Sequence, residues 1–251
     1  MMEYFWKQYE ELPAGIGYER FSLQHFITLF ALFILIAAAL ILFGKLEEKQ
    51  KKRILVAIPL LMILLECTKD SFLLYRGYFG VGYLPLHLCS LGIFVFLAAS
   101  LSRSLRWKKI FGEIAVTLIL PGSIAALIFP DWAHLYPVWN FLNLYGYLYH
   151  GLLVLYPLLM LRAGQTDLTI RHIHYDFLFL LCVVPPVYLF DKVFACNYMF
   201  VNWPPRGTPL AWIAQITGDS LYLLGYAFFA AAVIVVIYLL IGFVAEMRKN
   251  R

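Results

Sequence analysis

The stretch FITLFALFILIAAALILFG, residues 26–44, has no charged side chain and a single hydroxyl. An α-helix rises 1.5 Å per residue, so about 20 apolar residues cross the roughly 30 Å hydrocarbon core of a bilayer. Residues 26–44 come close to that length without a charge. This stretch predicts a transmembrane helix, and it decides the class of fold.

The whole chain has the same character as this stretch. Of its 251 residues, 63% are hydrophobic and 14% are charged, and the mean hydropathy is +0.78. A soluble domain is roughly 45–50% apolar and about 25% charged. One water-soluble core cannot bury so much apolar surface, and no internal repeat or change of composition marks a second domain. We expect an all-α, polytopic membrane helical bundle in which residues 1–251 form a single transmembrane domain.

Seven apolar windows are long enough to span the membrane. Two of them are interrupted: the second ends with Glu66, Lys69 and Asp70, and the sixth is split by Pro185-Pro186. We count all seven as transmembrane helices, because each holds about 20 mostly apolar residues. The windows cover residues about 22–44, 54–75, 83–101, 110–129, 139–161, 175–193 and 220–245.

Lys and Arg are distributed unevenly among the segments outside these windows. Alternate segments hold 14 on one side and 6 on the other. The positive-inside rule assigns the side with more Lys and Arg to the cytoplasm, and seven spans then leave the N-terminus outside and the C-terminus cytoplasmic. Residues 1–20 lack the basic start and apolar run of a cleavable signal peptide. We expect a multi-pass protein of the cell membrane.

Several classes of site are not indicated by the sequence. The net charge is +5, but no solvated basic face supports nucleic-acid binding. The cysteines form no CxxC pair and no spaced Cys/His set, so we predict no metal site and no cofactor. Membrane lipids are the expected partners. The four cysteines are Cys67, Cys89, Cys182 and Cys196.

The fifth predicted span carries a polar face. Asn140, Asn143, Tyr147 and His150 are spaced 3, 4 and 3 residues apart, which places them on one side of a helix. Polar groups at membrane depth are costly and are therefore candidates for function. His150 is the strongest of them, because it lies about 16 Å into its span. The two amides are also typical of hydrogen bonds between helices.

Other predicted spans bring polar residues to the same outer depth. Polar faces avoid lipid by meeting one another, so we expect an outward-facing polar cavity above a largely apolar inner half. Ion pairing at the membrane surface and packing of tyrosines are the structural alternatives. The candidate residues are Glu66, Lys69 and Asp70 in the second span, His87 and Cys89 in the third, and Gln215, Asp219 and Tyr222 at the start of the seventh.

Cys89 and His150 together suggest covalent chemistry. A thiol becomes a strong nucleophile when an imidazole takes its proton or stabilises the thiolate. If helix tilt brings the two residues level, they suit acyl transfer from an ester, with Cys89 as nucleophile and His150 as general acid and base. Asn143, one turn before His150, is placed to orient the imidazole or to donate to an oxyanion. A lipid ester is the expected substrate, because the site lies at bilayer depth.

Two segments connect this hypothesis to a known family. LPLHLCSLGIF, residues 84–94, and NLYGYLYHG, residues 143–151, together with seven spans in 251 residues, resemble the bacterial YwaF family of integral membrane proteins. That family is similar to the animal ether-phospholipid acyltransferase called transmembrane protein 164, in which a cysteine and a histidine are the proposed catalytic pair. The resemblance assigns these roles to Cys89 and His150. It implies a lipid acyl donor and acceptor and leaves the substrate open.

Two other functions are compatible with the same residues. A small-solute transporter or ligand-binding membrane protein would use the cavity without catalysis, lined by Glu66, Lys69, Asp70 and Asp219. Transporters of this kind often contain broken helices and repeat symmetry, and no symmetry is detectable in this sequence. A purely structural partner subunit has no need of polar faces and is the least supported alternative.

Overall fold

The computed structural model describes residues 2–249 of the chain, and the side chains of residues 3–243. Residues 2–249 contain helices and no strand, which confirms the all-α prediction. Helices α4 and α5 are joined by a π-helical turn, η4. The bounds are α1 Leu23–Gly44, α2 Glu48–Arg76, α3 Leu88–Leu101, α4 Leu105–Ile114, η4 Ala115–Ile119, α5 Leu120–Ile128, α6 Phe141–Arg162, α7 Ile173–Phe194, α8 Pro209–Thr217 and α9 Tyr222–Lys249.

Five helical segments within residues 2–249 are long and apolar enough to cross a membrane, which confirms that the protein contains transmembrane helices. Two predicted spans do not meet this description on their own. Helix α2 has 29 residues, but it starts with a basic run and carries Glu66, Lys69 and Asp70 near its end. Helix α3 has 14 residues and is only about 21 Å long. The five segments are Leu23–Gly44, Leu105–Ile128, Phe141–Arg162, Ile170–Phe194 and Asp219–Phe243.

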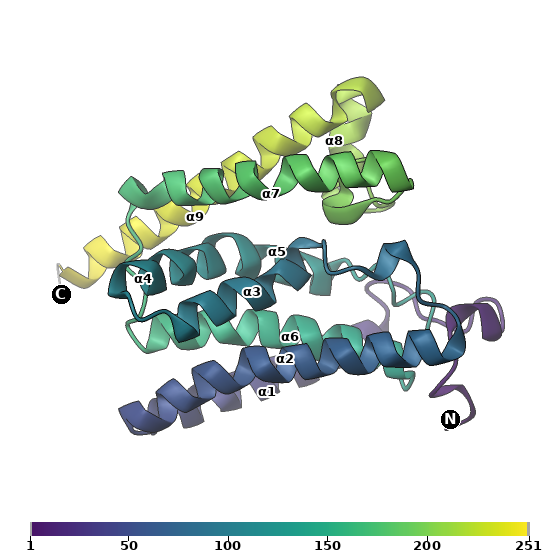
Figure 1. Ribbon diagram of the computed structural model, residues 1–251, viewed down its shortest axis with the longest axis horizontal. Helices are drawn as coiled ribbons and strands as arrows, with labels where there is room; N and C mark the ends of the chain where they lie inside the picture. Colours follow the sequence, from purple (N-terminus) through teal and green to yellow (C-terminus); the bar gives the residue numbers. More distant parts are fainter. Residues whose placement is uncertain (1, 250–251) are drawn as a thin grey trace.

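The long helices run side by side along the long axis of the molecule (Figure 1). Helices α1 and α2 lie on one side, α3 to α6 in the middle, and α7 and α9 on the other side, with α8 packed beside the start of α9. The connections after α1, α3 and α6 meet at one end of the bundle, at the left of Figure 1. We call this the basic end, because Lys45, Arg103 and Arg162 lie at or next to these connections. The connections after α2 and α5 lie at the opposite end.

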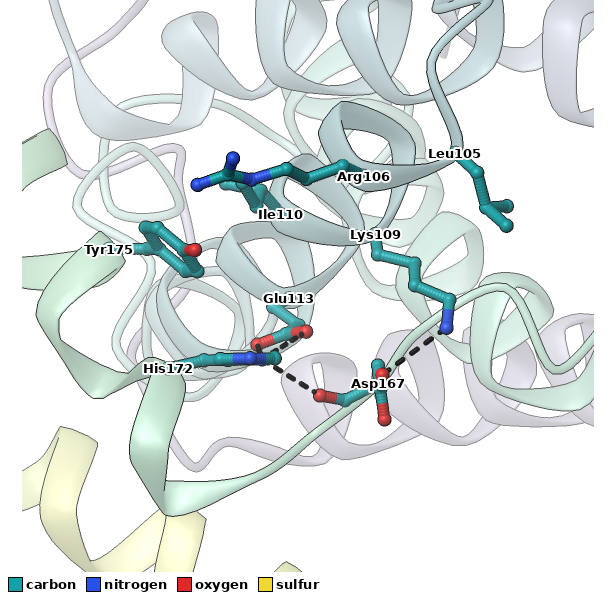
Figure 2. A pocket seen from close by; sticks show the side chains of 8 residues that line it. All are labelled: Leu105, Arg106, Lys109, Ile110, Glu113, Asp167, His172 and Tyr175. Atoms are coloured by element: carbon teal, nitrogen blue, oxygen red, sulfur yellow. Dashed lines mark hydrogen bonds and ion pairs between the residues drawn. The ribbon is translucent and has the colours of Figure 1, made fainter.

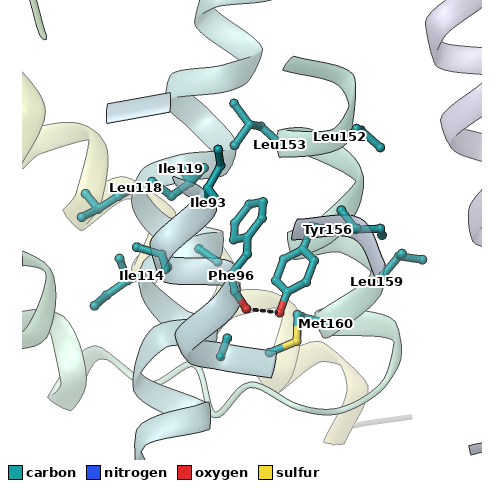
Figure 3. Close-up of a cluster of buried hydrophobic side chains, with 14 of the residues drawn as sticks. Ile93, Phe96, Ile114, Leu118, Ile119, Leu152, Leu153, Tyr156, Leu159 and Met160 are labelled. Atoms are coloured by element: carbon teal, nitrogen blue, oxygen red, sulfur yellow. Dashed lines mark hydrogen bonds between the residues drawn. The ribbon is translucent and has the colours of Figure 1, made fainter. Parts of the chain in front are cut away.

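A cluster of buried side chains joins α3 to α6 (Figure 3). A Cβ at Gly92 would lie 2.7 Å from a methyl group of Leu153, so only glycine permits this approach. One turn further, the rings of Phe96 and Tyr156 stack with centroids 4.0 Å apart, and the Tyr156 hydroxyl donates to the Phe96 carbonyl at 3.0 Å. Ser100 bonds both the Tyr156 hydroxyl and the Leu55 carbonyl of α2, each at 2.7 Å. These contacts fix the relative positions of α2, α3 and α6, which supply most of the site.

Proline affects two helices in different ways. Pro121 is the second residue after η4, and because proline has no N–H and its ring crowds the preceding turn, it accounts for the local change to π-helical bonding. In contrast, Pro185 and Pro186 do not split α7, which is continuous from Ile173 to Phe194. The expected break is therefore wrong, in keeping with the tolerance of membrane helices for proline where neighbouring groups satisfy the freed carbonyls.

The predicted polar face at the start of the seventh span is also wrong. Helix α8 ends at Thr217, and Gly218 has φ 75° and ψ 162°, a conformation that breaks the helix. Gln215 therefore belongs to α8, whereas Asp219 and Tyr222 begin a new helical segment. Their spacing in sequence does not place them on one face, because the intervening glycine changes the direction of the chain.

Candidate functional site

His150, near the middle of α6, is held by its own helix. Its Nδ1 lies 2.8 Å from the carbonyl oxygen of Gly146, one turn earlier. A carbonyl only accepts, so Nδ1 carries the proton in this bond. In the neutral imidazole, Nε2 then has the free lone pair. A backbone hydrogen bond thus fixes the tautomer that a general base requires.

Trp132, in the connection between α5 and α6, covers one face of this imidazole. The two rings stack at 18°, with centroids 5.0 Å apart. The indole reaches the helix because residue 146 is glycine: a Cβ there would lie 2.7 Å from Trp132 Cε2 and 2.8 Å from Nε1. The Nε1 atom is buried and has no partner among the described residues. Gly146 therefore positions His150 through its carbonyl and admits Trp132 through its missing side chain.

Cys89 lies in the first turn of α3 and is half-buried, with a free thiol. Tyr149 connects it to α6: the Tyr149 hydroxyl donates to the Cys89 carbonyl at 3.4 Å, and the Tyr149 ring centroid lies 5.9 Å from that of His150. The two predicted catalytic residues therefore share one neighbour, Tyr149.

No hydrogen bond joins the Cys89 thiol to the His150 imidazole within the described part of the chain. Catalytic hydrogen bonds are often long before substrate binds. Proton transfer between these two groups therefore requires a side-chain rotation or a bridging water or substrate hydroxyl.

The predicted charged face of α2 is present and is largely neutralised within itself. Lys69 Nζ lies 2.7 Å from Glu66 Oε1 and 3.1 Å from Asp70 Oδ1. Tyr145 of α6 donates its hydroxyl to the other oxygen of Glu66, and Lys69 also lies 5.5 Å from the Tyr145 ring centroid. Only 8% of Glu66 and 9% of Lys69 are exposed. Tyr145, which sequence reasoning missed, joins this ion pair to the helix that carries His150.

The N-terminal segment covers this end of the site. Gln8 is buried, donates to the Tyr83 hydroxyl and accepts from the Tyr136 hydroxyl, both at 2.9 Å. Burial raises the pKa of Tyr136 above its ordinary value, so its hydroxyl keeps the proton that it donates. Lys69 lies 6.0 Å from the Tyr83 ring centroid, which brings this layer into contact with the ion pair. The polar tail thus closes over the opposite end of the bundle.

Asn143 has neither of the roles expected for it. Its oxygen accepts from the Tyr18 hydroxyl at 3.1 Å, and its nitrogen donates to the Val138 carbonyl at 2.9 Å. Both ends of the amide are therefore occupied by structural bonds. Tyr147 lies on the same side of α6, and its buried hydroxyl has no partner among the described residues. Its ring packs edge-on to Trp132 with centroids 5.5 Å apart.

Two further candidates contribute mainly to structure. His87, directly before α3, accepts a hydrogen bond from the Met199 N–H at 3.2 Å and packs against the Tyr198 ring. Tyr222 donates to the Phe200 carbonyl at 2.7 Å. These bonds anchor the connection between α7 and α8 beside the site.

Gln215 and Asp219 do not join the other candidates. Both side chains are exposed, on either side of the helix break at Gly218. We therefore correct their assignment to the cavity lining. The pattern that suggested them, polar residues three and four apart, indicates a shared face only where the helix is continuous.

The basic end holds a second polar cluster, so the expected apolar inner half is wrong. Glu113 is 1% exposed, and both its oxygens lie 3.0 Å from His172 Nδ1. Thr117 of the π-helical turn donates to Asp176 at 2.7 Å. The second oxygen of Asp176 and the nearby Tyr238 hydroxyl are buried without partners among the described residues. Two carboxylates within apolar helices were the available signal, because charged residues at membrane depth are rarely incidental.

Comparison with known proteins identifies the family. The family model described as the TMEM164 family matches residues 20–238, a range that includes Cys89, His150 and Glu113. No curated protein and no solved structure matches the chain. Among residues 2–249, no group of three or more His, Cys, Asp or Glu side chains is arranged to hold a metal ion. The match extends over most of the 251 residues, and the chain therefore belongs to the TMEM164 family of membrane proteins.

Proposed function

We propose that this protein transfers acyl groups from lipid esters to a lipid hydroxyl or to water, with Cys89 as nucleophile and His150 as general acid and base. The observation that carries the proposal is the bond between His150 Nδ1 and the Gly146 carbonyl, because it leaves Nε2 free to take a proton. Cys89 on α3 is the nearby side chain suited to nucleophilic attack, and Tyr149 contacts both residues. The similarity of LPLHLCSLGIF and NLYGYLYHG to the YwaF type of protein supports the same pair.

The proposed reaction has two steps. In the first, His150 Nε2 takes the thiol proton, the sulfur attacks the ester carbonyl, and the carbon–oxygen bond breaks as the imidazolium protonates the leaving alkoxide. The products are an acyl-thioester on Cys89 and a lipid alcohol. In the second, the acceptor hydroxyl gives its proton to Nε2 and attacks the thioester, and the Cys89 sulfur leaves and regains the proton.

Trp132 and Tyr147 support this reaction as candidate donors to the oxyanion. Each tetrahedral intermediate carries a negative oxygen, which is stabilised by preorganised N–H or O–H groups in a dry site. The Trp132 N–H and the Tyr147 O–H are buried beside His150 and free of partners within the described range. We propose these two groups in the role expected for Asn143.

We further propose seven spans, with the N-terminus outside and the C-terminus in the cytoplasm of the cell membrane. Helix α2 pairs its charges internally, and a short helical turn at Val81–Tyr83 precedes α3. Helix α9 ends opposite the N-terminal segment in Figure 1, as an odd number of spans requires. The excess of Lys and Arg at the basic end supports the cytoplasmic assignment of that end. The site would then face the outer leaflet.

An acyl-transfer assay tests the proposal. The purified full chain is reconstituted in vesicles that contain a diacyl phospholipid with a fluorescent acyl chain and a lysophospholipid acceptor, and products are separated by chromatography. We expect transfer or release of the labelled chain by the wild type, and loss of both in Cys89→Ser and His150→Gln. Cys182→Ser is the matched control, because Cys182 is exposed on α7 and lies outside the site.

Transfer that persists in Cys89→Ser would contradict the proposed nucleophile. The alternative, a small-solute transporter or ligand-binding protein, has weaker support, because Gln215 and Asp219 lie apart from the other polar residues and Lys69 is paired with Glu66. It predicts solute binding that is unchanged in Cys89→Ser and abolished when Glu66 is replaced by Gln. These two outcomes separate the hypotheses.

A further inference from the structure

The basic end contains a cavity of about 340 Å³ that none of the proposed chemistry uses (Figure 2). Its lining comes from α4, from the connection after α6 and from the start of α7. On α4 the lining residues are Leu105, Arg106, Lys109, Ile110 and Glu113, a spacing that presents one helical face. A volume of this size accommodates a small polar group rather than a whole lipid.

The cavity opens where the headgroups of a bilayer are expected. Trp107, next to Arg106, is 54% exposed, and its ring stacks on that of Phe111 with centroids 6.0 Å apart. An exposed tryptophan at the end of an apolar helix is typical of the membrane–water interface. The start of α4 therefore lies at headgroup depth.

The charges in the cavity are paired except for one. Lys109 Nζ lies 3.2 Å from Asp167 Oδ2, and His172 Nδ1 lies 3.0 Å from both oxygens of Glu113. Arg106 has no ion pair with an acid in the described part of the chain. Figure 2 draws its guanidinium on the side of the cavity near Tyr175, away from the paired Lys109. One unmatched guanidinium remains to bind an anion.

We propose that this cavity binds the phosphate group of a phospholipid headgroup through Arg106. A guanidinium binds phosphate oxygens with two parallel hydrogen bonds, and a phosphodiester has the single negative charge that one free arginine neutralises. Leu105, Ile110 and Tyr175 supply apolar surface for the glycerol and the first carbons of the chains. Glu113 and Asp167 line the same cavity and repel additional negative charge, which disfavours polyphosphates. The proposal is independent of the acyl-transfer chemistry.

Thermal unfolding of the purified full chain in detergent tests the proposal. A ligand that binds the folded state raises the unfolding midpoint. We expect phosphatidylglycerol to raise it by about 5 °C in the wild type, and diacylglycerol, which lacks the phosphate, to have no comparable effect. Arg106→Gln should lose the shift. Arg103→Gln is the matched control. Arg103 lies in the connection just before α4, outside the cavity lining, so this variant should keep the shift.

Inorganic phosphate is the third arm of the experiment. An equal shift with phosphate that also depends on Arg106 supports the phosphate site and identifies a soluble ion as its source. An equal shift with diacylglycerol, or a shift by phosphatidylglycerol that is unchanged in Arg106→Gln, would overturn the proposal. Loss of the shift in Arg103→Gln as well would attribute it to general surface charge and would also overturn it.

Discussion

Two histidines, one near the middle of α6 and one at the basic end, use the same ring nitrogen in different ways. His150 Nδ1 donates to a neutral backbone carbonyl, that of Gly146, at 2.8 Å. His172 Nδ1 instead faces both carboxylate oxygens of Glu113 at 3.0 Å. A neutral acceptor orients the imidazole without adding a charge, so the ring is free to take up and release a proton. A carboxylate partner places a negative charge beside the second ring, which suits structure or ion binding.

The surroundings of the two histidines also differ, because one lies among aromatic rings and the other among charged side chains. His150 stacks on Trp132 and lies beside Tyr149 of its own helix, with a thiol on the adjoining α3. His172 lies at the mouth of a cavity among Arg106, Lys109 and Glu113. Burial alone therefore does not define the role of a histidine. The acceptor at Nδ1 and the groups near Nε2 do so.

The largest effect is expected from Cys89→Ser. A serine hydroxyl is far less acidic than a thiol, so we expect acyl transfer to fall by at least about 10³-fold. The unfolding midpoint should stay near that of the wild type, because the Cys89 side chain is only half-buried. The vesicle assay measures the first quantity and thermal unfolding the second. Activity close to that of Cys182→Ser would remove Cys89 from the mechanism.

Replacing each histidine by glutamine tests the comparison directly. His150→Gln removes the general acid and base, and we expect a loss of about 10²–10⁴-fold in acyl transfer. His172→Gln should leave transfer within about threefold of the wild type while lowering the unfolding midpoint, because Glu113 loses a hydrogen-bond partner. The same assay and the same unfolding measurement apply to both variants. Equal losses of activity would mean that the two ends are not separate in function.

Gly146→Ala tests whether the position of Trp132 against His150 matters for activity. The added methyl group would overlap Trp132 and displace its indole from His150. We expect about a 10²-fold loss of activity, typical of a misplacement of about 1 Å, and a destabilisation of about 1–3 kcal/mol. Gly242→Ala is the control, since a Cβ at Gly242 of α9 meets nothing within 4 Å. Full activity in Gly146→Ala would show that the position of Trp132 is unimportant.

The smallest effect is expected at the basic end. Glu113→Gln keeps the shape of a buried side chain and loses its charge, and we expect a destabilisation of about 1–3 kcal/mol with acyl transfer unchanged. Asp167→Asn, at an exposed position, should change stability by no more than about 0.5 kcal/mol. Chemical or thermal unfolding of the two variants checks both values. A larger loss for Asp167 than for Glu113 would invert the expected order.

The sequence was sufficient for the class of fold, because hydropathy reports directly on the solvent around a helix. It predicted the membrane location and the all-α architecture. The prediction of a continuous polar helix face from Gln215 to Tyr222 is wrong, because Gly218, with φ 75°, ends the helix between them. The sequence also predicted a break at Pro185-Pro186 that α7 does not have. Periodicity carries no information on backbone direction at a single residue.

The candidate site was predictable in its residue types and not in its bonds. Asn143 and Trp132 illustrate the limit. The spacing of Asn143 to His150 predicts that its amide faces the imidazole. Instead, the amide bonds Tyr18, which is distant in the sequence, and the carbonyl of the loop residue Val138. Trp132 lies outside the predicted spans and reaches His150 only because of the missing side chain at Gly146. Contacts between connections and helices depend on packing, which one sequence does not specify.

If the proposed mechanism holds, Cys89 carries the acyl group between donor and acceptor. Intact-protein and peptide mass spectrometry of the purified chain, after a short incubation with a diacyl phospholipid and no acceptor, detects this intermediate. We expect one added acyl group on Cys89, released by hydroxylamine as a thioester is, and absent from Cys89→Ser and strongly reduced in His150→Gln. An acyl group on another residue, or none on Cys89 while lipid is being turned over, would contradict it.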